Sequence, residues 1–169
     1  WHQHGWRHVN HETDGKKQEF GASRSRSDIK RDLLLGKRRL EDLLEAEFHP
    51  VFTPPWNRCS LGTLQLLGEL GYVAVSRCRG SMPPAPRGVP DFYVNIDLHT
   101  RKERDPAVGW KNLLGEFQQA ASSKFCGIMI HHQRMNAAAF DFLEMLIRIL
   151  VKRREIQLAN YKDLNWLGA

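Results

Sequence analysis

The stretch that decides the fold is Ser27–Ser76, SDIKRDLLLGKRRLEDLLEAEFHPVFTPPWNRCSLGTLQLLGELGYVAVS. Its first part, Ser27–Phe48, places apolar residues at steps of three and four with charged residues between them. That spacing predicts an amphipathic helix, because residues three and four apart share one helix face. Ser25 or Ser27 is expected as the N-cap, and Asp28 suits the positive end of the helix dipole.

The same alternation of helical and strand-like patterns continues along the chain. The expected helices are Ser60–Leu70, Trp110–Ala121 and Ala137–Lys152, and the expected strands are Pro50–Thr53, Tyr72–Ser76, Phe92–Leu98, Cys126–Ile130 and Glu155–Leu158. Strands separated by helices predict an α/β fold, either a parallel sheet or a (β/α) barrel. In such folds the chemistry collects where strands end and loops begin.

Length and composition favour one globular domain over residues 1–169. The chain has 169 residues, of which 41% are hydrophobic and 26% charged, enough for a real core. No apolar run is long enough to span a membrane. The unpaired cysteines Cys59, Cys78 and Cys126 favour a reducing compartment such as the cytoplasm. Because the chain begins at Trp1, we expect it to be the C-terminal part of a longer protein.

The net charge of +6 raises the alternative of a basic nucleic-acid-binding module, with HVNH as a nuclease-like fragment. The basic residues are spread out, however, in small clusters such as Arg77–Arg79 and Arg101–Arg104, usually near acidic residues. No aromatic residues interleave with them as a stacking platform requires. The interpretation as solvated surface is therefore favoured, and no nucleic-acid partner is expected.

The opening segment, WHQHGWRHVNHE, holds four of the eight histidines. His4 and His8 are four residues apart, and Gly5 frees the backbone so that both rings can converge. Neutral imidazole is the commonest protein ligand for zinc. The segment therefore predicts a divalent-metal site at His4 and His8; a merely His-rich surface stretch is the alternative.

Two further segments carry candidate functional residues at the ends of predicted strands. His131 and His132 follow the apolar run CGIMI, and a histidine there can act as a general acid or base. Since neighbouring strand residues point to opposite faces, one of the two is expected to face the His4 and His8 cleft, and we expect His131. The rigid turn Pro54–Arg58 presents an aromatic ring, an amide and a guanidinium, which suit sugar stacking or oxyanion positioning.

Taken together, these segments resemble the polysaccharide deacetylases of carbohydrate esterase family 4, in a divergent bacterial branch. HGWRH at His4–His8 resembles the motif whose two histidines supply metal ligands, and TPPW at Thr53–Trp56 falls where the family has a turn lining the active-site groove. IMIH, ending at His131, resembles the last motif. KQEFG at Lys17–Gly21 and the sequence PPWNR complete the likeness, which covers most of the chain.

The resemblance implies a metal-dependent hydrolase that removes acetyl groups from N-acetylated carbohydrate. It implies a distorted (β/α) barrel whose N-terminal strands, with the catalytic aspartates, precede Trp1. His4 and His8 would bind the metal, expected to be zinc, and His131 would be the general acid. Pro55, Trp56 and Arg58 would contact the substrate. Without the upstream aspartates, residues 1–169 alone are expected to bind metal weakly and to release no acetate.

The sequence also departs from the family pattern. Thr53 replaces the family's arginine, for which Arg58 is a candidate substitute, and Trp56 replaces a tyrosine. The loss of that arginine supports the alternative of a non-catalytic sugar- or metal-binding member of the same fold. The family's aspartates are not carried over to Asp97 or Asp105. No role is assigned to His11 or His132, and the sugar and the oligomeric state are left open.

Overall fold

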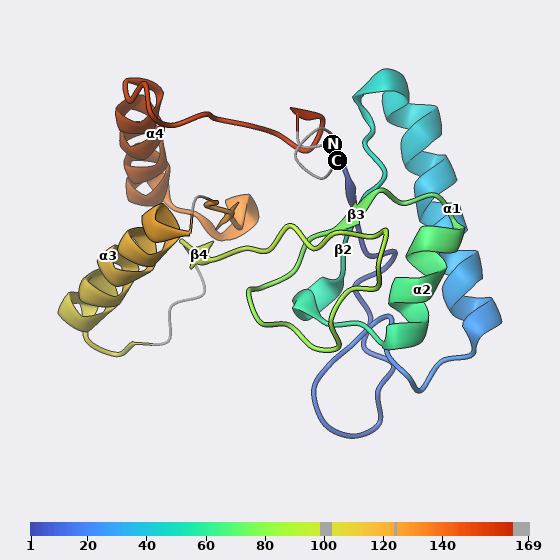
Figure 1. The fold of residues 1–169 in the computed structure, drawn as a ribbon. Coiled ribbons are helices and arrows are strands. Elements are labelled where there is room, and N and C mark those ends of the chain that lie inside the picture. The colour runs from blue at the N-terminus through green and yellow to red at the C-terminus, as the bar shows by residue number, and fades with distance from the viewer. Residues whose placement is uncertain (99–102, 124, 164–169) are drawn as a thin grey trace. The chain divides into compact units, whose positions relative to one another are not determined.

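The computed structural model describes residues 1–98, 103–123 and 125–163 (Figure 1). The described chain forms two compact units, one over Trp1–Tyr93 and a second that begins at Val94. Each unit has its own parallel strands and its own buried cluster. The expectation of one domain over residues 1–169 stays a prediction.

Both units consist of short strands followed by helices, as the alternation in the sequence predicts. The first unit contains β1 (Gln3–His4), α1 (Arg26–Leu44), η1 (Glu45–Glu47), β2 (Val51–Thr53), η2 (Pro55–Asn57), α2 (Leu61–Glu69) and β3 (Ala74–Val75). The second contains β4 (Ile96–Asp97), α3 (Pro106–Ser122), β5 (Ile128–Met129), η3 (His132–Arg134) and α4 (Ala137–Val151). The prefix η marks a single turn of 3-10 helix.

The sheet of the first unit is parallel, with the strand order β1-β2-β3. His4 lies opposite Thr53 in the ladder, and Phe52 lies opposite Val75. In a parallel sheet the carboxyl ends of all strands meet at one edge. The residues that follow His4, Thr53 and Val75 are therefore the candidates for a functional site in this unit.

The helix α1 begins at its N-cap Ser25, whose side chain accepts a hydrogen bond from the Asp28 N–H. α1 packs against α2 and against β1. Gly36 lies at the contact with β1, where an added Cβ would stand 2.2 Å from Gln3 Nε2. A glycine that lowers the helix propensity of α1 thus lets the helix approach the strand closely.

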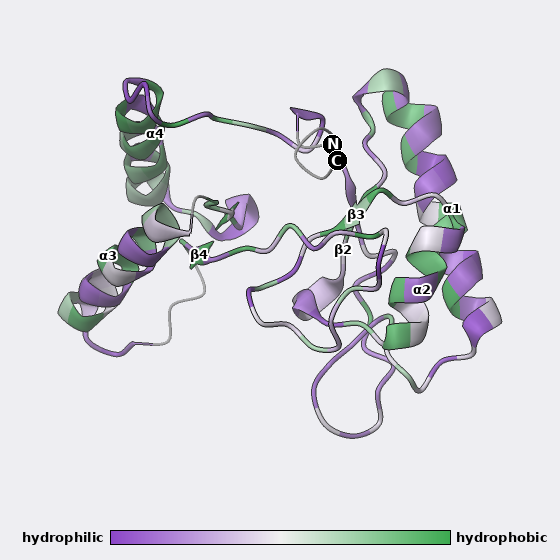
Figure 2. Cartoon of the chain, viewed as in Figure 1, coloured by the Kyte–Doolittle hydropathy of each residue, from purple (hydrophilic) through white to green (hydrophobic). Residues whose placement is uncertain are grey.

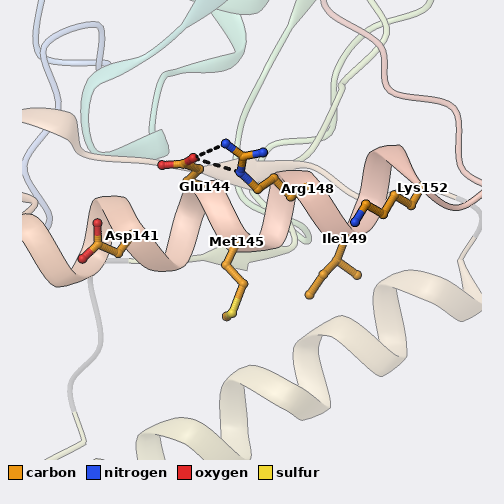
Figure 3. A pocket seen from close by; sticks show the side chains of 6 residues that line it. All are labelled: Asp141, Glu144, Met145, Arg148, Ile149 and Lys152. Carbon is orange, nitrogen blue, oxygen red and sulfur yellow. Dashed lines mark hydrogen bonds and ion pairs between the residues drawn. The ribbon is translucent and has the colours of Figure 1, made fainter.

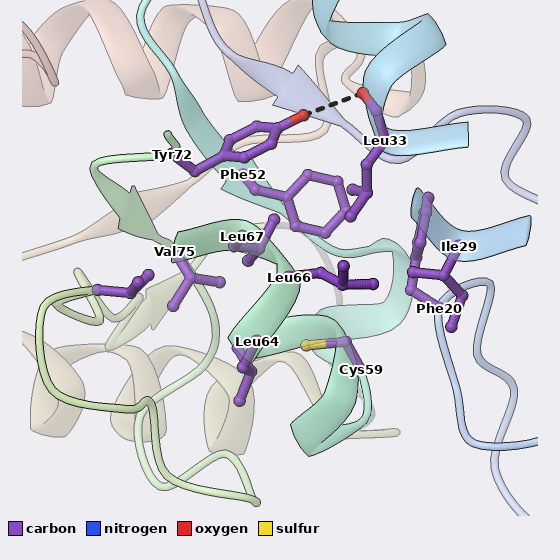
Figure 4. Packing of buried hydrophobic residues seen from close by; sticks show 11 residues of the cluster. Phe20, Ile29, Leu33, Phe52, Cys59, Leu64, Leu66, Leu67, Tyr72 and Val75 are labelled. Carbon is purple, nitrogen blue, oxygen red and sulfur yellow. Dashed lines mark hydrogen bonds between the residues drawn. The ribbon is translucent and has the colours of Figure 1, made fainter. Parts of the chain in front are cut away.

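The core of the first unit is a cluster in which α1, α2 and the sheet meet (Figure 4). Phe52 packs edge-to-face on both Phe20 and Tyr72, with ring centroids 5.1 Å and 5.9 Å away. The buried members are Phe20, Ile29, Leu33, Phe52, Cys59, Leu64, Leu66, Leu67, Tyr72, Val75 and Val89. Burial of each large side chain contributes about 1.5–3 kcal/mol, so this cluster is the main source of the unit's stability.

The second unit is built on the parallel pair β4 and β5, in which Ile96 lies opposite Ile128. The side chain of Asn95 joins the two segments: its Nδ2 donates to the Phe125 carbonyl at 2.9 Å, and its Oδ1 accepts from the Gly127 N–H at 2.7 Å. Ile96, Leu113 and Ala120 form the small buried cluster.

The helix α4 is apolar along most of its length (Figure 2), yet none of its residues is buried within the described chain. Its exposed apolar residues are Phe140, Met145, Ile147, Ile149 and Val151. An open hollow along α4 is lined by Asp141, Glu144, Met145, Arg148, Ile149 and Lys152 (Figure 3). The 2.6 Å ion pair of Arg148 with Glu144 lies at this hollow, which contains none of the residues that the sequence predicts for a site.

Several strand predictions were too long, and one was wrong. The predicted strands Tyr72–Ser76 and Phe92–Leu98 shrink to the two-residue strands β3 and β4. Cys126–Ile130 is not a buried strand, because Cys126 is exposed and β5 is only half-buried. Glu155–Leu158 forms no strand. β-branched and aromatic residues favour strands, but the pairing partner decides how far a strand extends.

Candidate functional site

The histidine-rich opening segment begins with a strand and continues as a loop at the carboxyl edge of the sheet. His4 ends β1, and the Gly5 N–H donates to the Thr53 carbonyl at 3.2 Å. Gly5 then turns the chain with a φ of +63°. The turn brings the rings of His4 and His8 together, with centroids 5.4 Å apart and planes inclined by 47°. The convergence that Gly5 was expected to permit is present.

The turn that follows β2 supplies an aromatic ring to the same place. Trp56 has a φ of 55° and Asn57 a φ of 60°, both in the left-handed region that costs a non-glycine residue roughly 1–2 kcal/mol. This conformation directs Trp56 at His8, with ring centroids 4.4 Å apart and planes inclined by 61°. His8 itself has a φ of 57°. His4, His8 and Trp56 therefore form one cluster, called here the histidine–tryptophan cluster.

Polar residues of the opening segment hold the loop beyond His8. Asn10 Oδ1 accepts the N–H groups of Glu12 and Gln18, at 3.2 Å and 2.9 Å. The Glu12 carboxylate accepts the Ser23 N–H and the Ser23 hydroxyl, at 3.2 Å and 2.8 Å. The non-histidine polar residues of HVNHE, Asn10 and Glu12, thus hold the local backbone in shape.

His2 lies beside the cluster and is held as a neutral ring. Its Nε2 lies 2.9 Å from Thr53 Oγ1. Burial, together with the nearby positive charges of His4 and the N-terminus, lowers the pKa of His2 from 6.5 to about 4. The hydroxyl of Thr53 is therefore in contact with the residue that precedes β1.

His4 and His8 are the residues of the cluster that could hold a divalent metal. An imidazole nitrogen binds zinc at about 2.0–2.1 Å, so two rings on one tetrahedral ion have centroids about 5 Å apart. The 5.4 Å between His4 and His8 agrees with this spacing. Among the described residues, no group of three or more His, Cys, Asp or Glu side chains is placed to hold one ion. Within the described ranges the site thus offers a pair of ligands, fewer than the three protein ligands of a typical catalytic zinc site.

The other residues predicted to contact substrate lie in the same turn as Trp56. Pro55 is buried under the Gly5 turn, where an added Cβ on Gly5 would stand 2.6 Å from Pro55 Cγ. Arg58 is half-buried, and its N–H donates to the Pro55 carbonyl at 3.3 Å. Pro55 therefore packs against the Gly5 turn and supports its conformation.

His131 and His132 belong to the second unit. His131 follows β5 and is half-buried, and its carbonyl accepts the Arg134 N–H at 2.8 Å. His132 is exposed in η3. The prediction that His131 faces His4 and His8 stays a prediction.

The structural role of Arg77, two residues beyond the end of β3, was not predicted from the sequence. Arg77 was counted in a solvated basic cluster, Arg77–Arg79, and this was wrong, because its side chain is completely buried. Its Nε and Nη2 donate to Asp91 Oδ2 at 3.0 Å and 2.6 Å, and its Nη1 donates to the Pro83 carbonyl at 2.9 Å. An arginine without an adjacent acidic residue at the end of a buried strand was the available signal.

Comparisons with known proteins support the fold. No protein-family profile matches the chain. A crystal structure of a protein from Mycobacterium smegmatis, assigned as a polysaccharide deacetylase, superposes with a TM-score of 0.67 at 15% identity, over 96% of this chain and 60% of that one. The chain therefore has a mixed α/β fold that resembles the polysaccharide deacetylase fold, and it spans 60% of the length of that structure.

A second comparison concerns sequence alone. The chain is 27% identical over 96 residues to the potassium-binding subunit of a potassium-transporting ATPase from Methylococcus capsulatus, which is 57% of this chain and 16% of that protein. In the described part of the chain, no helix is both long and apolar enough to cross a membrane. A match to one sixth of a protein at this identity assigns no family.

Proposed function

We propose that this chain is part of a metal-dependent hydrolase that removes acetyl groups from N-acetylated carbohydrate, with the distorted (β/α) barrel of the polysaccharide deacetylases as its fold. The observation that carries the proposal is the pairing of His4 and His8 at the carboxyl end of β1. The fold likeness to the mycobacterial structure supports it independently, and the motif HGWRH contains the same two histidines.

The residues of the cluster have distinct roles in this proposal. His4 and His8 hold the metal, taken to be zinc, through neutral imidazole nitrogens. Zinc, when bound, polarises the amide carbonyl and lowers the pKa of a water molecule. Trp56 offers an aromatic wall on which a sugar ring can stack, and its contact with His8 fixes that wall relative to the ligands. Arg58, in the same turn, supplies a positive charge for the developing oxyanion.

His131 is proposed to donate the proton to the leaving amine. An imidazole ring can carry and donate a proton, so a histidine can act as a general acid. His131 lies two residues beyond β5, and catalytic residues of α/β folds are commonly found near such strand ends, which supports this role. The carboxylate that accepts the proton of the attacking water is not assigned to any residue of this chain.

The metal is tested by titrating zinc into the chain in competition with a chromophoric chelator. The double variant His4→Ala/His8→Ala is expected to lose zinc affinity at least about tenfold, because both ligands are removed. His11→Ala/His49→Ala removes two histidines outside the cluster and serves as the matched control. Equal affinity in wild type and the His4/His8 double variant would refute the metal site.

The reaction is tested separately, by acetate release from N-acetylated chito-oligosaccharide with the natural protein that carries this sequence. Acetate release that is lost in His4→Ala and in His131→Ala supports the hydrolase. Zinc binding and sugar binding without acetate release would instead support the non-catalytic alternative, which the threonine at position 53 favours.

A further inference from the structure

Glu19 is a buried carboxylate that the proposed chemistry does not use. Its side chain is 1% exposed, and no ion pair engages it within the described residues. A carboxylate removed from water without a cation is costly, so its hydrogen-bond partners must compensate. Those partners are the backbone N–H groups of Trp6 and Arg7, thirteen and twelve residues away in the sequence.

The two oxygens of Glu19 bind two consecutive backbone groups. Oε1 accepts the Arg7 N–H at 2.6 Å, and Oε2 accepts the Trp6 N–H at 3.2 Å. These two residues lie between the proposed metal ligands His4 and His8. A glutamine side chain has an NH₂ donor in place of one of these two oxygens, so it cannot accept one N–H group at each terminal atom as Glu19 does.

The turn at Gly5 is built around the same carboxylate. An added Cβ on Gly5 would stand 2.4 Å from Glu19 Oε2 and 2.6 Å from Pro55 Cγ. Gly5 therefore lies directly against Glu19 on one side and against the Trp56 turn on the other. The contact explains why the turn between His4 and His8 has a glycine with positive φ at this position.

The position of Glu19 is fixed by its neighbour Phe20. Phe20 is completely buried, and its carbonyl accepts the Ser60 N–H at 2.9 Å and the Thr63 hydroxyl at 2.8 Å. The carboxylate thus extends from a rigid part of the core toward a loop that lies on the surface. A loop with His8 in a left-handed conformation needs such an external restraint to keep one geometry.

We infer that Glu19 is a positioning residue for the metal site, because it holds the backbone between His4 and His8 so that both rings face one ion. This inference rests on the proposed function, since it assumes that the two histidines bind a metal. Glu19 acts through the loop and contacts neither the ion nor the substrate. Groups of this kind commonly change metal affinity by about 10–100-fold when they are replaced.

The test compares two substitutions of the same chemical type in the same segment. Glu19→Gln withdraws the bidentate acceptor, and Glu12→Gln makes the same change in charge at a carboxylate that binds Ser23 instead. Zinc affinity is measured by chelator competition, and the visible spectrum of the Co²⁺-loaded chain reports on the ligand geometry. Far-ultraviolet circular dichroism checks that each variant is folded.

Glu19→Gln is expected to weaken zinc affinity at least about tenfold and to shift the Co²⁺ spectrum, whereas Glu12→Gln leaves both unchanged. Glu19→Asp keeps the charge but is one methylene shorter, so it is expected to give a smaller loss and serves if Glu19→Gln does not fold. If the folded Glu19 variants bind zinc as tightly as the wild type and give the same Co²⁺ spectrum, the inference about Glu19 is overturned. The proposed metal site still stands in that case, because the wild type binds zinc. Absence of zinc binding by the wild type would overturn both.

Discussion

Replacement of Asp91 by alanine is expected to destabilise the first unit strongly, because it leaves the positive charge of Arg77 buried without a counter-ion. The Arg77 side chain is 0% exposed, and Asp91 accepts two of its hydrogen bonds through one oxygen. The third bond, to the Pro83 carbonyl, remains in the variant. A single neutral acceptor does not compensate the desolvation of a guanidinium.

The size of the effect follows from the burial of the pair. Removal of one partner of a buried ion pair costs about 3–5 kcal/mol. Asp91 is 22% exposed on its side chain, so water screens part of the interaction, and we expect the lower end, about 3 kcal/mol. The pair Arg26–Glu69 is as short, at 2.5 Å, but both side chains are more than half exposed. Glu69→Ala is therefore expected to cost less than about 1 kcal/mol.

The two variants are compared by urea unfolding at neutral pH, followed by tryptophan fluorescence, with Trp6 packed against the core of this unit. The double variant Arg77→Met/Asp91→Leu removes both charges and is expected to recover at least half of the loss, because no charge is left unpaired. It stays below the wild type, since the Pro83 carbonyl loses its donor. Equal losses for Asp91→Ala and Glu69→Ala would refute the argument that burial rather than distance sets the energy.

Two further predictions concern single residues of the first unit. Gly5→Ala is expected to lower the free energy of unfolding in urea by more than about 2 kcal/mol, because strain at positive φ adds to the clash with Glu19 and Pro55. The control Gly15→Ala has a φ of +79° but open space around it, so it is expected to cost only about 1 kcal/mol. Equal costs for the two variants would contradict the packing argument. Exposed Cys126 is expected to react with a thiol reagent in the native chain while Cys59 does not, because burial, opposed in part by Arg77, raises the Cys59 pKa to about 12. Because the pKa of Cys59 is higher in the folded than in the unfolded chain, the stability that the neutral thiol contributes is complete below about pH 9 and is lost as the pH rises toward 12. Rapid labelling of Cys59 in the native chain at pH 8 would contradict its burial.

The helices were predictable because each has a local signal. The apolar spacing of Ser27–Phe48 and the caps Ser25 and Ser60 lie within a few residues of the helices they define, and α1 and α2 begin where the sequence indicates. Strand ends had no such signal. β1 consists only of Gln3 and His4, two polar residues without strand propensity, and it is a strand because it pairs with β2.

The candidate site was predictable only in part. His4 and His8 were found because their ring chemistry and their spacing are both visible in the sequence, and the Trp56 turn because two prolines mark it. The residues that hold the site and the sheet in place, Glu19 and Arg77, were not predictable. Glu19 and Arg77 function through partners twelve to fourteen residues away, across loops without regular structure, and a charged residue in a loop reads as solvated until its partner is known.

The closeness of Gly5 to both Glu19 and Pro55 limits which substitutions this protein can accept. A side chain at the position of Gly5 fits only if the acidic side chain and the proline ring both move away from it, so a change at this position alone is expected to destabilise the fold. The residues at these three positions are therefore expected to change together among relatives. Sequence searches that weight the combination of glycine, glutamate and proline at these separations should recognise distant relatives that a histidine motif alone misses.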